Sequence, residues 1–470
     1  MLLHSGSGQD ILIRESFHLR VPFRNVFALA IFSLDIGSMR GGKILGEGVA
    51  GCVLTAPSWP CVTGSSDVPS VSDPSVVSKI VPSSDTESRY LKVAARILGP
   101  ELSKRYLAGL RGECSPANAS HPPNQTNAVA LKLDTEALVK SNTTGACKKL
   151  KQALTSKKGI TEGHKLMFIS RYPMTLEEWA TSLKPMNQSS LISLLHAIPM
   201  FLSVLQRLVQ DQKEQLVHID LHSNNIFVRP LQGGQIELGI SDFGQCFTRD
   251  YSKAETSVEF FGNYLCNFVA KYTYYYGYRQ VPLEARLLNF CYKRNADTLT
   301  LQEFVSAWLK ECLPHQKGDF DIVMMNLTPW MTSLMKKKLF IEMLEQIQSI
   351  SRKMRLYSTN PRQLTDVLTP LEKVLLSYVM TRYTVVSPLN SILEICLIIA
   401  NNAKPPLLKE SNELKIVSEF LRRASMAPYD QDGSSLSVAL TSIQGADMGV
   451  VWSDVSFSIG SAVGAVLSSE

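Results

Sequence analysis

The stretch that decides the fold runs His218-Ile219-Asp220-Leu221-His222-Ser223-Asn224-Asn225 and is followed by Ser241-Asp242-Phe243-Gly244. Between the two segments lie β-prone residues, at 226–228 and 237–240. These runs predict two short strands joined by a turn, which would bring the ends of both segments together. Because carboxylate and amide oxygens are the ligands that Mg²⁺ requires, the two segments predict a magnesium-assisted site.

A glycine-rich segment earlier in the chain predicts a phosphate-binding loop. Glycines at 46, 48 and 51 would let backbone N–H groups approach phosphate oxygens without a side chain in the way. A dinucleotide-binding loop has the same G-x-G-x-x-G spacing but opens a helix, whereas β-prone residues follow here. For this segment taken alone, an ordinary glycine-rich hairpin stays open as the alternative. The residues predicted to hold the nucleotide are Gly46, Glu47, Gly48, Val49, Ala50, Gly51, Cys52 and Val53.

A lysine between the two motifs completes the predicted site. Lys79 lies inside the apolar strand pattern of residues 76–81, where a cation needs a partner. We expect it to contact the nucleotide phosphates while a carboxylate on a helix holds it. Glu87 is the first candidate for that carboxylate and Asp85 the second, although Ser84-Asp85-Thr86-Glu87 also fits an N-terminal capping box. A solvated lysine at a strand edge is the alternative for Lys79.

The residue types at three further positions suit phosphoryl transfer. Asp220 would orient an attacking hydroxyl and accept its proton, and Asn225 and Asp242 would hold Mg²⁺ against the phosphates of ATP. The candidate catalytic residues are Asp220, Lys79 and His222, the candidate metal ligands are Asn225 and Asp242, and the expected cofactors are ATP and Mg²⁺.

The two histidines of the motif have different predicted roles. His218 is expected to brace the loop and not to transfer protons. His222 stands where many protein kinases carry a lysine that contacts the γ-phosphate. Because D-L-H-x-x-N also occurs in enzymes that resemble aminoglycoside and choline phosphotransferases, a small-molecule acceptor stays open.

Composition excludes several classes of protein. The chain has 470 residues, of which 45% are hydrophobic and 19% charged, so it can bury a sizeable core. Its net charge of +6 suits acidic ligands such as phosphate but is too small to indicate nucleic-acid binding. We expect no membrane span, because the apolar run at 26–34 is too short and Asp454 interrupts residues 449–469, which are rich in glycine and serine.

The nine cysteines include no Cys-x-x-Cys pair, and their number is odd. This pattern predicts a reducing intracellular compartment. A zinc site is the weaker alternative, because its four candidate ligands match no structural zinc spacing. Those four are Cys52, Cys61, Cys114 and Cys147.

Strand-like segments come first and helical segments later, which predicts an α+β fold in two lobes. The expected divisions are an extension at 1–38, a β-rich N-lobe at 39–172 with insertions at 57–75 and 112–164, a helical C-lobe at 173–440 with an insertion at about 300–370, and a tail at 441–470.

The chain resembles the eukaryotic-type serine/threonine protein kinases of large nucleo-cytoplasmic DNA viruses. Three segments beyond the shared motifs carry the resemblance: Gly51-Cys52-Val53 with Pro60-Cys61, Ser78-Lys79-Ile80 with Glu87 and Gly99-Pro100, and Pro282-Leu283-Glu284-Ala285-Arg286. It covers residues 40–290 and, loosely, 375–440. It implies a bilobal protein-kinase-like fold, Ser/Thr phosphorylation of protein substrates with ATP and Mg²⁺, a bracing role for Glu284 in the C-lobe, and a place in infected host cytoplasm or in virions.

Two positions depart from that family. Ile219 stands where many kinases have an arginine that binds a phosphorylated loop, so we expect activity without phosphorylation of residues 245–280. Thr384 stands where the family's Asp-x-Tyr-Ser-Leu-Gly helix would place the aspartate that braces the catalytic loop. A weakly active or non-catalytic kinase-like scaffold is therefore a third interpretation, beside a protein kinase and a small-molecule phosphotransferase.

Overall fold

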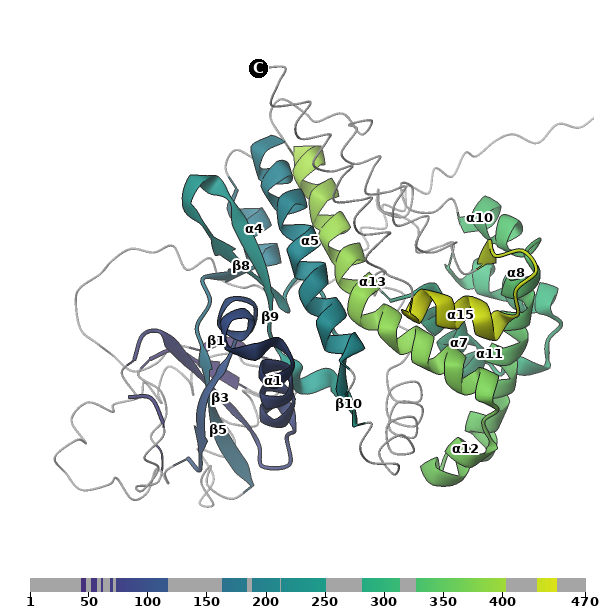
Figure 1. The fold of residues 1–470 in the computed structure, drawn as a ribbon, viewed down its shortest axis with the longest axis horizontal. Coiled ribbons are helices and arrows are strands. Elements are labelled where there is room, and N and C mark those ends of the chain that lie inside the picture. The colour runs from purple at the N-terminus through teal and green to yellow at the C-terminus, as the bar shows by residue number, and fades with distance from the viewer. Residues whose placement is uncertain are drawn as a thin grey trace, which may run out of the picture. The chain divides into compact units, whose positions relative to one another are not determined.

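The computed structural model describes residues 44–47, 52–56, 61, 68–70, 73–116, 163–183, 188–211, 213–250, 281–312, 327–402 and 429–445. This part of the chain is mixed α+β, with three small antiparallel sheets and a largely helical second half (Figure 1). The coarse prediction of strands first and helices later is confirmed. The predicted extension at 1–38, and most of the insertions at 57–75 and 112–164 and of the tail, lie outside the described residues.

The largest sheet has five strands in the order β1-β2-β3-β5-β4. Its strands are β1 Ile44–Glu47, β2 Cys52–Leu54, β3 Val76–Pro82, β4 Leu110–Cys114 and β5 His164–Ser170. Side chains alternate between the two faces of a strand, so Lys79 shares a face with Val77 and Val81. Those two valines belong to the core that includes helix α1, whereas Ile80 packs in a separate cluster on the other face. The strand pattern thus directs Lys79 toward α1.

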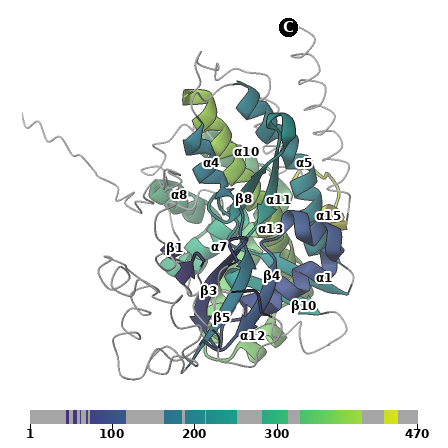
Figure 2. The same cartoon turned by 90° about the vertical axis from the view of Figure 1, so that its left-hand side faces the viewer.

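Helix α1, Glu87–Tyr106, lies beside this sheet (Figure 2). The predicted stop at Gly99-Pro100 is a break and not an end: Gly99 has φ 75 and ψ 171, and helical geometry resumes up to Tyr106. The predicted capping box is wrong. The side chain of Thr86 at the N-cap makes no capping hydrogen bond, and the N–H of Glu87 donates instead to Asp85 Oδ1 at 2.8 Å. The side chain of Glu87 is thereby left for another partner.

Two further sheets carry the segments on which the sequence analysis began. The three-stranded sheet has the order β6-β8-β9, and β7 pairs with β10. Their bounds are β6 Met174–Thr175, β7 Glu214–His218, β8 Ile226–Pro230, β9 Ile236–Ile240 and β10 Cys246–Asp250. The predicted strands at 226–228 and 237–240 are confirmed as an antiparallel pair, with Ile226 opposite Ile240. This pairing brings residue 225 and residue 241 to the same end of the hairpin.

Most of the described helices pack around two hydrophobic clusters. Helices α4 Leu176–Ser182 and α5 Gln188–Gln210 contribute to the first. The second, around Trp308 and Phe340, is built by α7 Leu283–Arg294, α8 Leu301–Cys312, α10 Leu327–Leu334, α11 Lys338–Leu356, α12 Pro361–Val367 and α15 Leu436–Gly445. The region predicted as an insertion at about 300–370 is therefore part of a core.

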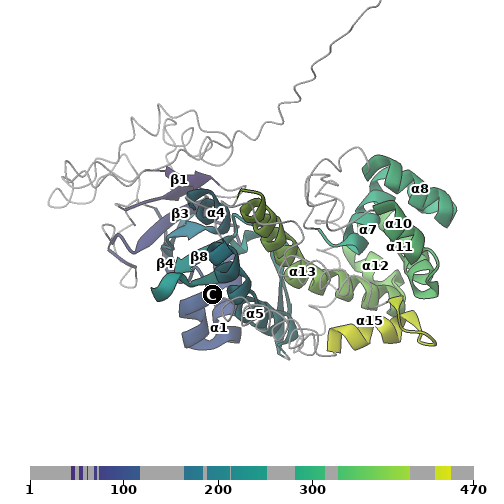
Figure 3. The same ribbon diagram turned by 90° about the horizontal axis from the view of Figure 1, so that it is seen from above.

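Helix α13, Pro370–Asn402, connects the two clusters (Figure 3). Its earlier residues, such as Tyr378 and Val379, are buried in the second cluster, and its later residues, such as Val385 and Ile392, are buried in the first. The segment 218–225 also contacts both clusters, because Ile219 is buried in the second cluster and Leu221 in the first. At position 219, an apolar side chain thus fills core space.

Within the described residues, one helix is long and apolar enough to cross a membrane, at 189–210 in α5. In its most apolar window, 56% of the residues are buried inside the protein. Leu194, Phe201 and Leu205 are fully buried in the first cluster. The apolar character of α5 is accounted for by this packing.

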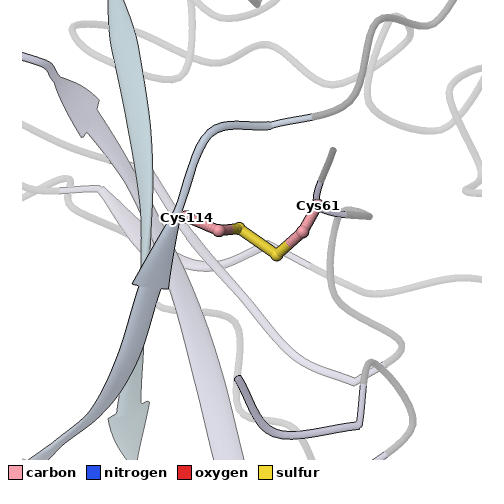
Figure 4. The surroundings of a disulfide bond; sticks show 2 residues. All are labelled: Cys61 and Cys114. Carbon is pink, nitrogen blue, oxygen red and sulfur yellow. A yellow bond between two sulfur atoms is a disulfide. The ribbon is translucent and has the colours of Figure 1, made fainter. Parts of the chain in front are cut away.

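Cys61 and Cys114 form a disulfide, with Cα atoms 5.8 Å apart (Figure 4). Cys52 is disulfide-bonded as well. This bonding removes the zinc alternative, because the Cys61 and Cys114 sulfurs are bonded to each other. The free cysteines of the described residues, Cys246, Cys291 and Cys396, are buried. Spacing along the sequence did not show which cysteines the sheet brings together.

The close approach of β9 to an aromatic ring gives a test of the packing. A Cβ added at Gly239 would collide with the buried ring of Phe227, which stacks on Tyr172 at 4.8 Å. We expect Gly239→Ala to lower the free energy of unfolding by about 1–3 kcal/mol in urea denaturation, because the ring has to shift. Gly109→Ala is the matched control, since its nearest new contact is an ordinary 3.9 Å. If both variants lowered the free energy of unfolding by the same amount, the tight packing of Gly239 against Phe227 would be contradicted.

Candidate active site

Lys79 binds two carboxylates, one 8 residues away in the sequence and the other 163 residues away. Its Nζ lies 2.6 Å from Glu87 Oε2, on α1, and 3.0 Å from Asp242 Oδ1, after β9. Lys79 is 5% exposed and Glu87 is buried. The expected pairing of Lys79 with Glu87 is confirmed, while Asp85 accepts a backbone hydrogen bond. The strand-edge alternative for Lys79 is wrong, because β3 is inside the sheet between β2 and β5.

The charges in this cluster fix its protonation. Burial disfavours the charged form of Lys79, but the charges of Asp242 and Glu87 outweigh this effect and raise the pKa of its ammonium. Burial disfavours the charged form of Asp242 too and would raise its pKa, but the positive charge of Lys79 outweighs burial and lowers the pKa of Asp242. The cluster therefore holds a protonated lysine and an ionised Asp242.

Asp242 has an unusual backbone conformation that sets the direction of its side chain. It is one of two non-glycine residues with positive φ in the described part of the chain, at φ 54 and ψ 72. Non-glycine residues adopt this left-handed conformation rarely, and Asp is among those that tolerate it. The next residue, Phe243, is fully buried and lies edge-on to His218 at 5.3 Å between ring centroids. An anchored neighbour and the Lys79 contact thus hold Asp242 in place.

Asp220 and Asn225 lie in direct contact. Asn225 Nδ2 donates to the Asp220 carbonyl at 2.7 Å and approaches Asp220 Oδ2 at 3.4 Å. The Asn225 carbonyl in turn accepts hydrogen bonds from both N and Oγ of Ser241, each at 3.0 Å. Since Ser241 precedes Asp242, these bonds join the two motifs into one site. With its amide nitrogen turned toward Asp220, Asn225 has Oδ1 as the atom that could ligate a metal.

His218 serves as a brace. Its Nδ1 accepts the N–H of Asp220 at 3.3 Å, and its Nε2 lies 3.2 Å from the Ser241 carbonyl. A neutral ring with the proton on Nε2 satisfies both contacts. Burial lowers the pKa of His218 to about 4, so the ring is neutral at physiological pH. These contacts agree with the bracing role that the sequence predicted.

Thr384 on α13 holds the backbone of His218 from the other side. Its Oγ1 accepts the His218 N–H at 2.9 Å and donates to the His218 carbonyl at 3.3 Å. Ser391, farther along α13, donates to the Leu221 carbonyl at 3.3 Å. The position expected to carry a bracing aspartate is thus occupied by a hydroxyl that contacts both polar groups of one peptide residue.

His222 and a residue that the sequence did not indicate form the outer part of the site. His222 Nδ1 accepts the N–H of Asn224 at 3.2 Å, and its Nε2 lies 3.9 Å from Asp220 Oδ1. Glu177, in the first turn of α4, accepts hydrogen bonds from Ser223 Oγ and Asn224 Nδ2 at 3.0 and 2.8 Å. No sequence signal linked Glu177 to this loop, because the contact depends on where α4 packs.

The glycine segment is described only at its two ends. Gly46 and Glu47 lie in β1, Cys52 and Val53 lie in β2, and the two strands pair antiparallel. A strand therefore follows the segment, as predicted, and this excludes the strand-to-helix loop of a dinucleotide site. Gly48, Val49, Ala50 and Gly51 lie outside the described residues.

Among the described residues, no group of three or more His, Cys, Asp or Glu side chains has the geometry to hold a metal ion. The predicted magnesium ligands are one carboxylate and one amide, Asp242 and Asn225. Sites of this kind complete the shell of Mg²⁺ with phosphate oxygens and water. The oxygen donors present fit such an ion.

No protein-family model matches the chain, and a search of the curated proteins finds no match.

The Thr384 contacts predict a loss of stability that a matched pair of variants isolates. Thr384→Val keeps the shape but leaves the buried N–H of His218 without its acceptor, so the free energy of unfolding should fall by about 2–3 kcal/mol. Thr384→Ser keeps the hydroxyl and loses only a methyl group, at a cost of about 1 kcal/mol. Urea denaturation measures both. A Val variant as stable as the Ser variant would contradict the bracing role.

Asp220 should make stability depend on pH. Burial, together with the charge of Asp242, raises the pKa of Asp220 to about 7, although the Asn225 hydrogen bond opposes the shift. As the pH rises, the Asp220 carboxyl loses its proton near pH 4 in the unfolded chain but only near pH 7 in the folded chain. Between about pH 4 and pH 7, Asp220 therefore lowers the free energy of unfolding progressively. Asp220→Asn cannot ionise and should be the more stable protein above pH 7, by about 1–2 kcal/mol, because the side chain is 33% exposed and partly screened. Denaturation at about pH 5 and pH 8 tests this. A stability difference that stays constant or shrinks toward pH 8 would refute it.

Proposed function

We propose that the protein transfers the γ-phosphate of ATP, with Mg²⁺, to Ser or Thr hydroxyls of protein substrates. The observation that carries the proposal is the placement of Lys79 between Glu87 and Asp242. Strand β3, helix α1 and the segment after β9, which is 163 residues from Lys79, meet at one ammonium group. Each supplies a residue type that phosphoryl transfer by a protein kinase needs.

Each residue of the cluster has a separate task in this proposal. Lys79, held by Glu87, presents its charge to the nucleotide phosphates. Asp220 orients the acceptor hydroxyl and takes its proton, and its pKa of about 7 makes it a competent base near neutral pH. Asn225 and Asp242 would hold Mg²⁺, which supplies charge neutralisation at the phosphates when bound.

Contacts outside the site support a bilobal protein-kinase-like fold. Glu284, in the segment that resembles the kinase Ala-Pro-Glu motif, is buried and lies 3.2 Å from Arg382 Nε on α13. Tyr429 Oη donates to the other carboxylate oxygen of Glu284 at 2.8 Å. An ion pair buried at this place is consistent with the bracing role that the resemblance implies for Glu284. The same resemblance implies a place in infected host cytoplasm or in virions.

Two alternatives are distinguished by particular residues. A small-molecule phosphotransferase is favoured by His222, which stands near Asp220 in place of a lysine. A weakly active or non-catalytic scaffold was suggested by Thr384, but the two hydrogen bonds of Thr384 supply a brace without a carboxylate. All four residues expected to carry the chemistry, Lys79, Asp220, Asn225 and Asp242, are present.

The decisive measurement is transfer of labelled γ-phosphate from Mg-ATP to generic basic and acidic proteins, and to a panel of aminoglycosides and choline. We expect label on protein Ser or Thr, reduced by about 100-fold or more in Asp220→Asn and in Lys79→Met. Asp366→Asn and Lys310→Met are matched controls at exposed positions and should keep wild-type activity.

Other outcomes assign the alternatives. Label on a small molecule alone would replace the protein acceptor by a small one. Nucleotide binding without transfer to any acceptor would favour the scaffold. Wild-type activity in Lys79→Met would show that the lysine cluster does not do the proposed chemistry.

A further inference from the structure

A cavity lies between α1 and β4, and none of the candidate active-site residues lines it. Its volume is about 710 Å³, and it is bounded by residues of α1 from Leu91 to Lys104, by β4, by the connection between them and by Ser170 at the end of β5. A second cavity of about 580 Å³ adjoins it along α1 and shares Lys92 and Glu113. We call these two neighbouring cavities together the α1–β4 groove.

The floor of the α1–β4 groove is apolar. Leu91 and Ala95 of α1 line it together with Leu107 and Leu110. Leu91 and Leu107 are buried, whereas Ala95 and Leu110 are half-buried. The apolar area that a ligand side chain could cover therefore belongs mainly to Ala95 and Leu110, and covering it would favour binding.

The rim carries an excess of positive charge. Lys92 is paired with Glu113 at 2.6 Å, but Lys104 and Arg111 also line the cavity, and both are exposed. Arg111 uses Nε to bind Ser170 Oγ at 2.7 Å. The adjoining cavity adds Arg89. An apolar floor within a basic rim is complementary to a polypeptide that has both acidic and large apolar side chains.

We propose that residues 446–470 of this chain occupy the α1–β4 groove. This segment contains three acidic residues, Asp447, Asp454 and Glu470, and no lysine or arginine. It also contains two large aromatic side chains, Trp452 and Phe457, close to Asp454. The segment 446–470 thus combines acidic side chains, which suit the basic rim, with large apolar side chains, which suit the apolar floor.

The attachment of the segment makes the docking feasible. It follows α15, which ends at Gly445. An extended segment of this length spans up to about 80 Å, more than the roughly 60 Å diameter of a compact chain of this size. Tethering also keeps the segment at high local concentration, so modest contacts suffice.

Docking would act on the helix that carries Glu87. The groove is formed by one side of α1, and the Glu87 carboxylate on the same helix binds Lys79. A segment bound in the groove would hold α1 against β4 and favour that ion pair. This effect on transfer rests on the proposed function, whereas the docking itself does not.

The test places a photoreactive p-benzoylphenylalanine at position 452 of the full-length chain. After irradiation, mass spectrometry should locate the crosslink within residues 88–113. Lys104→Glu/Arg111→Glu should reduce its yield by about fivefold or more, because two attractive rim charges become repulsive. Lys310→Glu/Lys336→Glu makes the same change at exposed lysines outside the groove and should leave the yield unchanged.

Three results would overturn the proposal. One is a crosslink outside residues 88–113, and another is an equal yield from the Lys104/Arg111 variant. The third is a crosslink between copies, detected by mixing isotope-labelled and unlabelled protein, which would assign the segment to a second chain. The Asp220→Asn protein should give the same crosslink as wild type, so a failure of docking is separate from a failure of catalysis.

Discussion

The buried contact of Lys79 with Glu87 and Asp242 is the interaction on which the rest of the site depends. A buried ammonium without partners would cost several kcal/mol, so β3, α1 and the segment after β9 have to meet for this lysine to be tolerated. Removing either carboxylate would leave the buried charge of Lys79 without full compensation, so the fold is stable only when both carboxylates reach the lysine. The requirement to satisfy one cation therefore positions elements that the sequence separates by more than a hundred residues.

Helix α13 is the second support of the candidate site, because it holds the segment 218–225. The contacts of Thr384 and Ser391 hold the backbone around His218 and Leu221. The same helix also contains Arg382, which forms an ion pair with Glu284. Because α13 packs in both hydrophobic clusters, the loop is attached to a helix that is buried along most of its length. A hydroxyl suffices at position 384 because both of its hydrogen-bond partners belong to one residue, and no charge has to be buried to reach them.

The sequence predicted those features that local pattern and residue type control. Lys79 in an apolar strand needed a carboxylate. The apolar run at the start of β8 and the alternating residue types of β9 were enough to locate both strands. It failed where packing between distant elements decides the outcome. Residues 84–87 fit a capping box locally, yet no such box forms, because the side chain of Glu87 binds Lys79. Strand β4 was not predicted, because exposed Arg111 and Glu113 alternate with only half-buried neighbours. Glu177 and the Cys61–Cys114 pairing have no local signature at all.

The bond between Cys61 and Cys114 links two residues that lie 53 apart in the chain, and β3 and α1 both fall within this span. Lys79 and Glu87 therefore sit on one covalent ring. While the bond is intact, a single cut by a protease anywhere in that ring leaves both fragments attached to each other. On a denaturing gel, a chain cut once between Cys61 and Cys114 would separate into two fragments only after a reducing agent breaks the disulfide.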